Sequence, residues 1–175
     1  WYWGAMHHYG HSMRNGAAEI YGQVEDCLKE AELIVYWASD PEVTNGVYGS
    51  FEGTTRRLWA KELGIDMVHI DPYLNETAAF LGGKWIAPKP STSPALAQAI
   101  TYVWIKEGLY DRDYVKKRTT GFDKWKAYIM GEDEDGIART PEWAEEETGV
   151  PAREIRALAR EWGSRKTYLS AGGMG

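Results

Sequence analysis

The fold is decided by LIVYWASDPEVTNG, residues 33–46 of this 175-residue chain. Its first five residues are apolar, which is typical of a strand buried on both faces of a parallel sheet. Ser39, Asp40 and Pro41 then end the strand in a tight turn, and a polar loop follows. In an open α/β sheet, a loop at the carboxyl end of a strand is the usual place for a ligand. We therefore expect the ligand site here.

The segments on either side of this loop complete a βαβ unit. A helix is predicted over residues 49–64, ending at Gly64, and a second strand over residues 66–72. Two strands joined by a helix within about 40 residues should be parallel. The further elements expected are helices at 17–31, 94–107, 111–117, 121–130, from 140 and at 151–162, and strands at 84–88 and 167–170. The predicted fold class is α/β, a Rossmann-like parallel sheet with flanking helices.

Two details of this scheme concern the region between the second strand and the next long helix. Residues 75–90 are predicted as a long connection, interrupted only by the short strand. After it, Ser93 is expected to cap the helix and Pro94 to open it, since serine is a favoured N-cap and proline a favoured first helical residue.

Composition excludes several classes of protein. The net charge of −6 argues against a nucleic-acid or anionic-membrane surface. No apolar run is long enough for a membrane span, and the first residues do not resemble a signal peptide. The single cysteine, Cys27, excludes an internal disulfide framework, a zinc finger and an iron–sulfur cluster held by this chain alone; we expect it in the core. Neither end resembles a natural terminus, so residues 1–175 are expected to form one fragment of a larger protein.

The first loop offers polar groups without a standard nucleotide fingerprint. No G-x-G-x-x-G and no Walker lysine loop is present, which disfavours an ordinary NAD, FAD or ATP site. Ser39 and Thr44 nevertheless offer hydroxyls, and a helix N-terminus near Gly49 would suit phosphate. Asp71, at the tip of the second strand, can accept ribose hydroxyls or the N1–H and 2-amino groups of guanine. The alternative is that Asp40 and Asp71 only form turns before prolines.

Three histidines are the remaining chemical signal. His7 and His11 have the i, i+4 spacing that can bind a metal on a helix, with His8 between them. No aspartate, glutamate or cysteine stands among them, so we expect a structural role and predict no metal site. No catalytic residue can be assigned. The residues alone predict a Rossmann-like ligand-binding domain.

The motifs follow, in order along nearly the whole chain, those of a known family. Residues 35–44 resemble W-G-(S/A)-(N/D)-P-x-x-T, residues 69–78 resemble I-D-P-x-x-(T/N)-x-T-A, and residues 85–92 resemble I-x-P-(R/K)-P-G-T. Residues 95–108, 110–115, 119–123, 140–144 and 148–151 continue the pattern. On these residues the chain resembles the molybdenum or tungsten enzymes of the dimethyl sulfoxide reductase type, which carry a bis-molybdopterin guanine dinucleotide cofactor (bis-MGD).

The resemblance implies that this region is a Rossmann-like domain gripping one of the two guanine dinucleotides. Carried over by position, the residues that would line phosphate and ribose are Ala38, Ser39, Asp40 and Thr44. Those that would hold the guanosine are Ile70, Asp71 and Pro72, and those that would close on the base are Pro90, Thr92 and Ser93. Ser93 stands where the family has an acid, so Asp71 or a residue outside the fragment is expected to grip guanine instead.

The first sixteen residues narrow the resemblance to one branch of the family. They resemble transhydroxylases of the pyrogallol-to-phloroglucinol type, in which this stretch follows the segment that supplies a serine ligand to molybdenum. The metal ligand is then expected upstream of Trp1. Iron–sulfur clusters are expected only on a partner subunit, and the implied enzyme is a cytoplasmic transhydroxylase or oxidoreductase of a small aromatic substrate.

The fragment alone is expected to be inactive and to pack against other domains of the same large subunit. Some of the aromatic residues are expected to face those domains, from among Trp1, Trp3, Tyr9, Tyr48 and Trp85. Two alternatives stay open: a Rossmann-like domain for another nucleotide such as NAD, and a non-catalytic interaction module.

Overall fold

The computed structural model describes residues 24–43 and 52–171. Within these ranges, the strands β1 (Leu33–Trp37), β2 (Asp66–Ile70), β3 (Lys84–Ile86) and β4 (Thr167–Ala171) form one sheet in the order β3-β2-β1-β4. Every neighbouring pair is parallel. This is the 3-2-1-4 order of a doubly wound Rossmann sheet. The predicted α/β class and the parallel Rossmann-like sheet are therefore confirmed.

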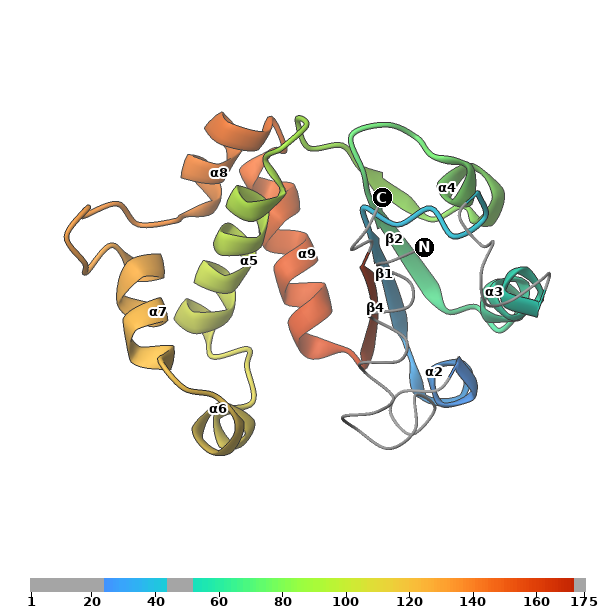
Figure 1. Cartoon of the computed structure of the whole chain (residues 1–175), viewed down its shortest axis with the longest axis horizontal. Helices are drawn as coiled ribbons and strands as arrows, with labels where there is room; N and C mark the ends of the chain where they lie inside the picture. The colour runs from blue at the N-terminus through green and yellow to red at the C-terminus, as the bar shows by residue number, and fades with distance from the viewer. Residues whose placement is uncertain (1–23, 44–51, 172–175) are drawn as a thin grey trace, which may run out of the picture.

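Helices cover both faces of the sheet (Figure 1). On one face lie α5 (Ser93–Glu107), α8 (Pro141–Thr148) and α9 (Ala152–Ser164). Outside them, α7 (Phe122–Met130) packs against α5, and α6 (Arg112–Arg118) lies at the outer end of this layer. On the other face lie α2 (Val24–Glu30), α3 (Glu52–Glu62) and α4 (Glu76–Leu81). No helix of the described ranges is long and apolar enough to cross a membrane.

The central strand β1 is buried on both sides, as its apolar run predicts. Leu33 and Val35 belong to the core shared with α5, α8 and α9. Ile34 and Tyr36 belong to the smaller core on the α2 and α3 face. Burying each such side chain stabilises the folded state by roughly 1.5–3 kcal/mol, so β1 contributes to the stability of both cores.

Two predictions between β2 and α5 are wrong. The connection 75–90 contains the helix α4, which begins after Asn75 and is only six residues long, too short to show a helical period. The N-cap of α5 is Thr92 and not Ser93, which is the first helical residue, with Pro94 second. The Thr92 hydroxyl donates to the Lys89 main-chain oxygen at 2.7 Å, so no side chain caps this helix.

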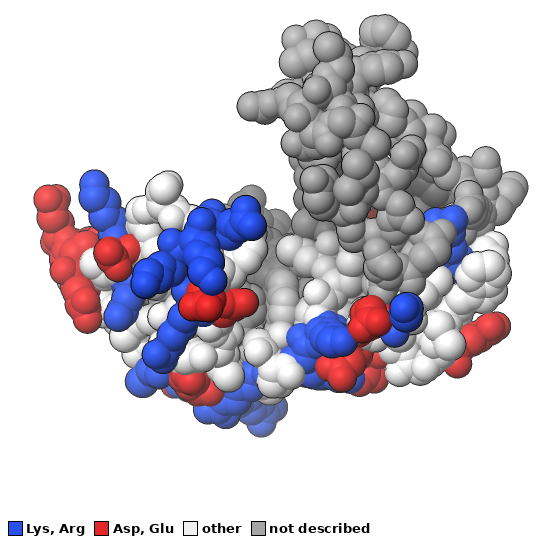
Figure 2. Space-filling model, turned by 90° about the horizontal axis from the view of Figure 1, so that it is seen from below, with Lys and Arg blue, Asp and Glu red and all other residues white. Residues whose placement is uncertain are grey.

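The surface near α6 mixes charges of both signs. Basic residues fill the last turn of α6. Figure 2, which views the molecule from below, shows basic and acidic side chains next to one another on this face. Lys117 pairs there with Asp113 at 3.4 Å. The segments that contain His7, His8, His11 and Thr44 lie outside the described residues.

Candidate functional site

The loops that follow β1 and β2 lie together at the carboxyl edge of the sheet. Because the strands are parallel, both loops leave the sheet at the same edge. The Ala38 N–H donates to the Ile70 main-chain oxygen at 2.9 Å, and the Asp71 N–H donates to the Ile86 oxygen at 3.1 Å. Among the described residues, the structure thus places Ala38, Ser39, Asp40 and Asp71, predicted site residues of the first two loops, at the same edge of the sheet.

Two residues at this edge have backbone angles that favour glycine. Ala38 has φ +45° and Ser91 has φ +66°. Both positions are glycine in the family motifs quoted above. A side chain in this left-handed region costs roughly 1–2 kcal/mol per residue, and such strain tends to collect at functional sites. Ala38 is solvent-exposed, so a small side chain there leaves room for a ligand to approach the loop.

The polar side chains of the first loop are held by their neighbours. The Ser39 hydroxyl shares a hydrogen bond with the Ser170 hydroxyl of β4 at 3.1 Å. Asp40 Oδ1 accepts two hydrogen bonds from Thr77, one from the hydroxyl at 2.6 Å and one from the main-chain N–H at 3.1 Å. The Asp40 carboxylate therefore fixes the loop, and its predicted contact with phosphate or ribose stays a prediction.

Asp71 is placed directly beyond β2, as predicted. Its side chain is only 7% exposed. Oδ1 accepts the Tyr73 N–H at 3.3 Å and Oδ2 accepts the Asn75 amide at 3.1 Å. Because each carboxylate oxygen has two lone pairs, both oxygens keep capacity for a ligand. Pro72 beside it is exposed. By contrast, the Ile70 side chain lies in the core, so Ile70 offers the site only its main chain.

The third predicted segment leads from β3 into α5. Pro90 is exposed, and Thr92 and Ser93 are half-buried at the start of α5. The first N–H groups of a helix lack intrahelical partners and carry partial positive charge. Ser93 also lines an open, largely apolar cavity of about 470 Å³. The aromatic side chains in its wall are Trp37, Trp104 and Trp162.

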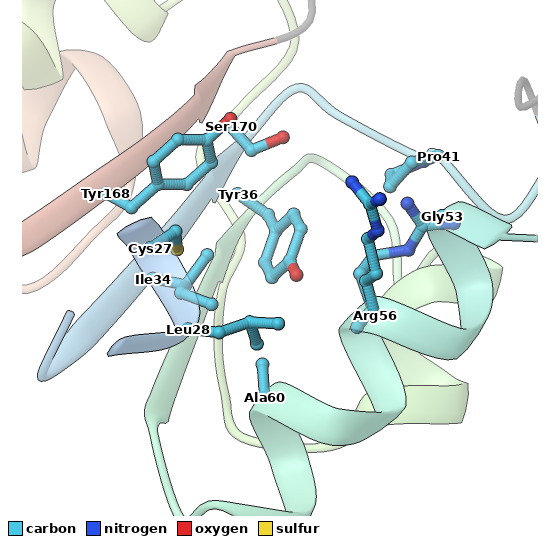
Figure 3. A pocket seen from close by; sticks show the side chains of 11 residues that line it. Cys27, Leu28, Ile34, Tyr36, Pro41, Gly53, Arg56, Ala60, Tyr168 and Ser170 are labelled. Carbon is cyan, nitrogen blue, oxygen red and sulfur yellow. The ribbon is translucent and has the colours of Figure 1, made fainter. Parts of the chain in front are cut away.

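A second, smaller cavity of about 110 Å³ lies on the other face, between α3 and the sheet (Figure 3). Tyr36, Arg56 and Ser170 point toward it, and Cys27 lies at its edge. Burial raises the pKa of the Cys27 thiol and the pKa of the Tyr36 hydroxyl, so both groups stay protonated at neutral pH. Cys27 is half-buried beside the smaller core, close to its predicted place.

The residues that support these loops were not among the predicted site residues. Asn75 and Thr77 are buried and bridge the loops after β1 and β2. An asparagine ahead of a short helix is an N-cap signal that could have revealed α4. Trp85 is 42% exposed, and its indole N–H donates to the Asp71 main-chain oxygen at 2.9 Å. Its contact with a neighbouring domain stays a prediction. Among the described residues, no group of three or more histidine, cysteine or acidic side chains could hold a metal ion.

Strand order defines the class of fold, a Rossmann-like α/β domain, and in such folds the carboxyl edge of the sheet is the usual place for a ligand. No model of a known protein family matches the chain. It is 53% identical over 175 residues to the pyrogallol hydroxytransferase large subunit of Pelobacter acidigallici. It is 36% identical over 166 residues to the dimethyl sulfoxide/trimethylamine N-oxide reductase of Cereibacter sphaeroides. These matches cover 100% and 90% of this chain and 20% of each relative.

A solved structure agrees with the fold. Acetylene hydratase from Pelobacter acetylenicus matches 84% of this chain and 18% of its own chain, with a TM-score of 0.64 and 20% identity. The chain belongs to the dimethyl sulfoxide reductase family of molybdenum enzymes, as its motifs predicted, and spans about a fifth of the length of these curated relatives.

Proposed function

We propose that this chain binds one guanine dinucleotide of a bis-MGD cofactor carrying molybdenum or tungsten, within the large catalytic subunit of a transhydroxylase. The substrate class proposed is a trihydroxybenzene, because the chain is 53% identical to a pyrogallol hydroxytransferase large subunit. The observation that carries the nucleotide proposal is the Asp71 carboxylate, held at the carboxyl edge with unused lone pairs.

The donor set at this edge suits a guanosine phosphate. A carboxylate accepts the N1–H and 2-amino group of guanine together, whereas adenine presents no such pair of donors on one edge. Asp71 would take guanine in this way, with Pro72 beside the base. Its remaining hydrogen bonds, to Tyr73 and Asn75, hold the carboxylate in one orientation before the ligand arrives. Preorganisation of this kind reduces the entropy lost on binding.

The hydroxyls and main-chain N–H groups at the carboxyl edge would form hydrogen bonds with the phosphate and ribose of the nucleotide. Ser39 carries a hydroxyl in the loop after β1, and Ser93 carries one at the first residue of α5. Phosphate oxygens are well matched by hydroxyl donors and by a helix N-terminus. When bound, the cofactor supplies the metal centre for the redox chemistry. This chain's own residues bind and orient the nucleotide end.

The partners follow from the same proposal. Other domains of the large subunit would cover exposed aromatics such as Trp85, Tyr73 and Phe80. Iron–sulfur clusters would lie on a small subunit, since the only cysteine of the chain, Cys27, cannot hold one alone. We keep the cytoplasm as the expected location.

The test uses the full-length large subunit with its partner. Asp71→Ala should lose charge-assisted hydrogen bonds worth about 1.5–3 kcal/mol each and so lower the guanine and molybdenum content of the purified protein. Asp66→Ala is the matched control, because Asp66 lies at the amino end of the same strand and pairs with Arg165 at 2.7 Å. Unchanged guanine content in Asp71→Ala would reject the proposal, and NAD in place of guanine would favour another Rossmann-like function.

A further inference from the structure

Thr77 connects the first loop of the site to α4. Its side chain is fully buried. The hydroxyl donates to Asp40 Oδ1 at 2.6 Å and also accepts the Glu42 N–H at 3.1 Å. The Thr77 main-chain N–H donates to the same Asp40 oxygen at 3.1 Å. The 2.6 Å separation is typical of a hydroxyl bound to an ionised carboxylate. One threonine thus sets both the acidic side chain and the backbone of the loop after β1.

Asn75 connects the same helix to both loops. Its Oδ1 accepts the Ala78 N–H at 2.9 Å and so caps α4. Its amide nitrogen donates to Asp71 Oδ2 at 3.1 Å and to the Ser39 main-chain oxygen at 3.4 Å. Asn75 is 1% exposed, so its amide is committed to these bonds and is not offered to solvent. The loops after β1 and β2 are therefore tied to each other through one side chain.

These two residues hold groups that would face a nucleotide, although they are themselves buried away from it. We propose that Thr77 and Asn75 are positioning residues of the nucleotide site, which fix the Asp40 and Asp71 carboxylates in the geometry that binds the guanine dinucleotide. This inference rests on the proposed function. Without the Thr77 hydroxyl, Asp40 loses its 2.6 Å partner and the loop after β1 loses its link to Glu42. A less ordered loop then binds with a larger entropic cost.

The experiment replaces Thr77 by valine in the full-length large subunit with its partner subunit. Valine keeps the shape of the buried side chain and removes only the hydroxyl. We expect molybdenum and released guanine per folded subunit to fall, with roughly tenfold weaker retention on dialysis, the scale set by one hydrogen bond to a charged group. Thr77→Ser restores the hydroxyl and should retain near wild-type content. If Thr77→Val does not accumulate, Thr77→Ala removes the same hydroxyl without placing a methyl group against Asp40.

Ile129→Val is the control for stability alone. Ile129 is fully buried in α7, outside the candidate site, so losing one methylene there weakens the packing of the core without touching the loops. Guanine loss in Thr77→Val, rescue by serine and normal content in Ile129→Val would support the positioning role. Normal content in Thr77→Val, or equal loss in both valine variants, would overturn it. Absence of guanine from the wild-type protein would reject the proposed function itself. Loss of guanine in Asp71→Ala together with normal guanine content in Thr77→Val would reject only this inference.

Discussion

A buried arginine between α7 and α8 offers the sharpest test of how this domain is held together. Arg139 is 6% exposed and pairs with Asp135. Its guanidinium carbon lies 4.4 Å from the centre of the Tyr128 ring and 5.1 Å from that of the Trp143 ring. In addition, the main-chain N–H of Arg139 donates to the Ile129 main-chain oxygen at 2.9 Å. One side chain therefore joins the end of α7, the turn after it and the first turn of α8.

Replacing Arg139 by lysine should destabilise this region by about 2–4 kcal/mol. Each desolvated cation–π contact is worth up to about 2 kcal/mol, and disrupting a buried ion pair costs roughly 3–5 kcal/mol when one partner is removed. Lysine keeps the charge, so only part of the ion-pair loss applies, but its compact ammonium cannot lie flat between two rings. The partly exposed Asp135 carboxylate, 37% accessible, reduces the loss further.

The assay is hydrogen exchange of peptides spanning 127–144 in the full-length subunit, with Arg160→Lys as the control. Arg160 makes a two-pronged pair with Glu107 on the surface, where solvent screens the charges, so Arg160→Lys should change protection only slightly. Faster exchange is expected in Arg139→Lys over this segment and not over β1. Equal protection in wild type and Arg139→Lys would refute the reasoning that burial makes this arginine the stronger contributor.

Two further predictions concern His69 and a glycine turn. Burial lowers the pKa of His69, whose Nε2 lies 2.9 Å from the Gly82 oxygen and whose ring stacks on Tyr36. Above the ordinary value of about 6.5 both folded and unfolded states are neutral; as the pH falls below it, the unfolded state protonates first and stability is lost. His69→Phe should therefore flatten the fall in melting temperature below pH 6.5, and parallel curves would contradict this assignment. Gly131→Ala should be strongly destabilising in thermal denaturation, because its Cβ would lie 2.5 Å from the Ala138 nitrogen, whereas Gly136→Ala meets nothing within 4 Å and should cost only the strain of its positive φ. Equal losses in the two alanine variants would show that strain, and not the clash, decides.

Local sequence patterns determined most of the fold. Residues 33–37 are apolar without interruption, and a strand with that pattern has to be covered on both faces, which already predicts a parallel sheet with helices on each side. Glycines that follow the helices, such as Gly64 and Gly108, marked where those helices end, because both have positive φ. The carboxyl-edge position of Asp71 also followed, since it needed only the end of one strand.

Tertiary structure alone decided which polar groups meet. Asp40 and Thr77 are 37 positions apart, and no local period relates them. The helix α4, only six residues long, is held by the Asn75 cap and by contacts from the two loops, so its stability comes from the packed domain and not from its own propensity. The burial of Arg139 depends in the same way on rings supplied by α7 and α8. Contacts of this kind cannot be predicted from local sequence patterns, because side chains distant in sequence meet only when the whole domain has folded.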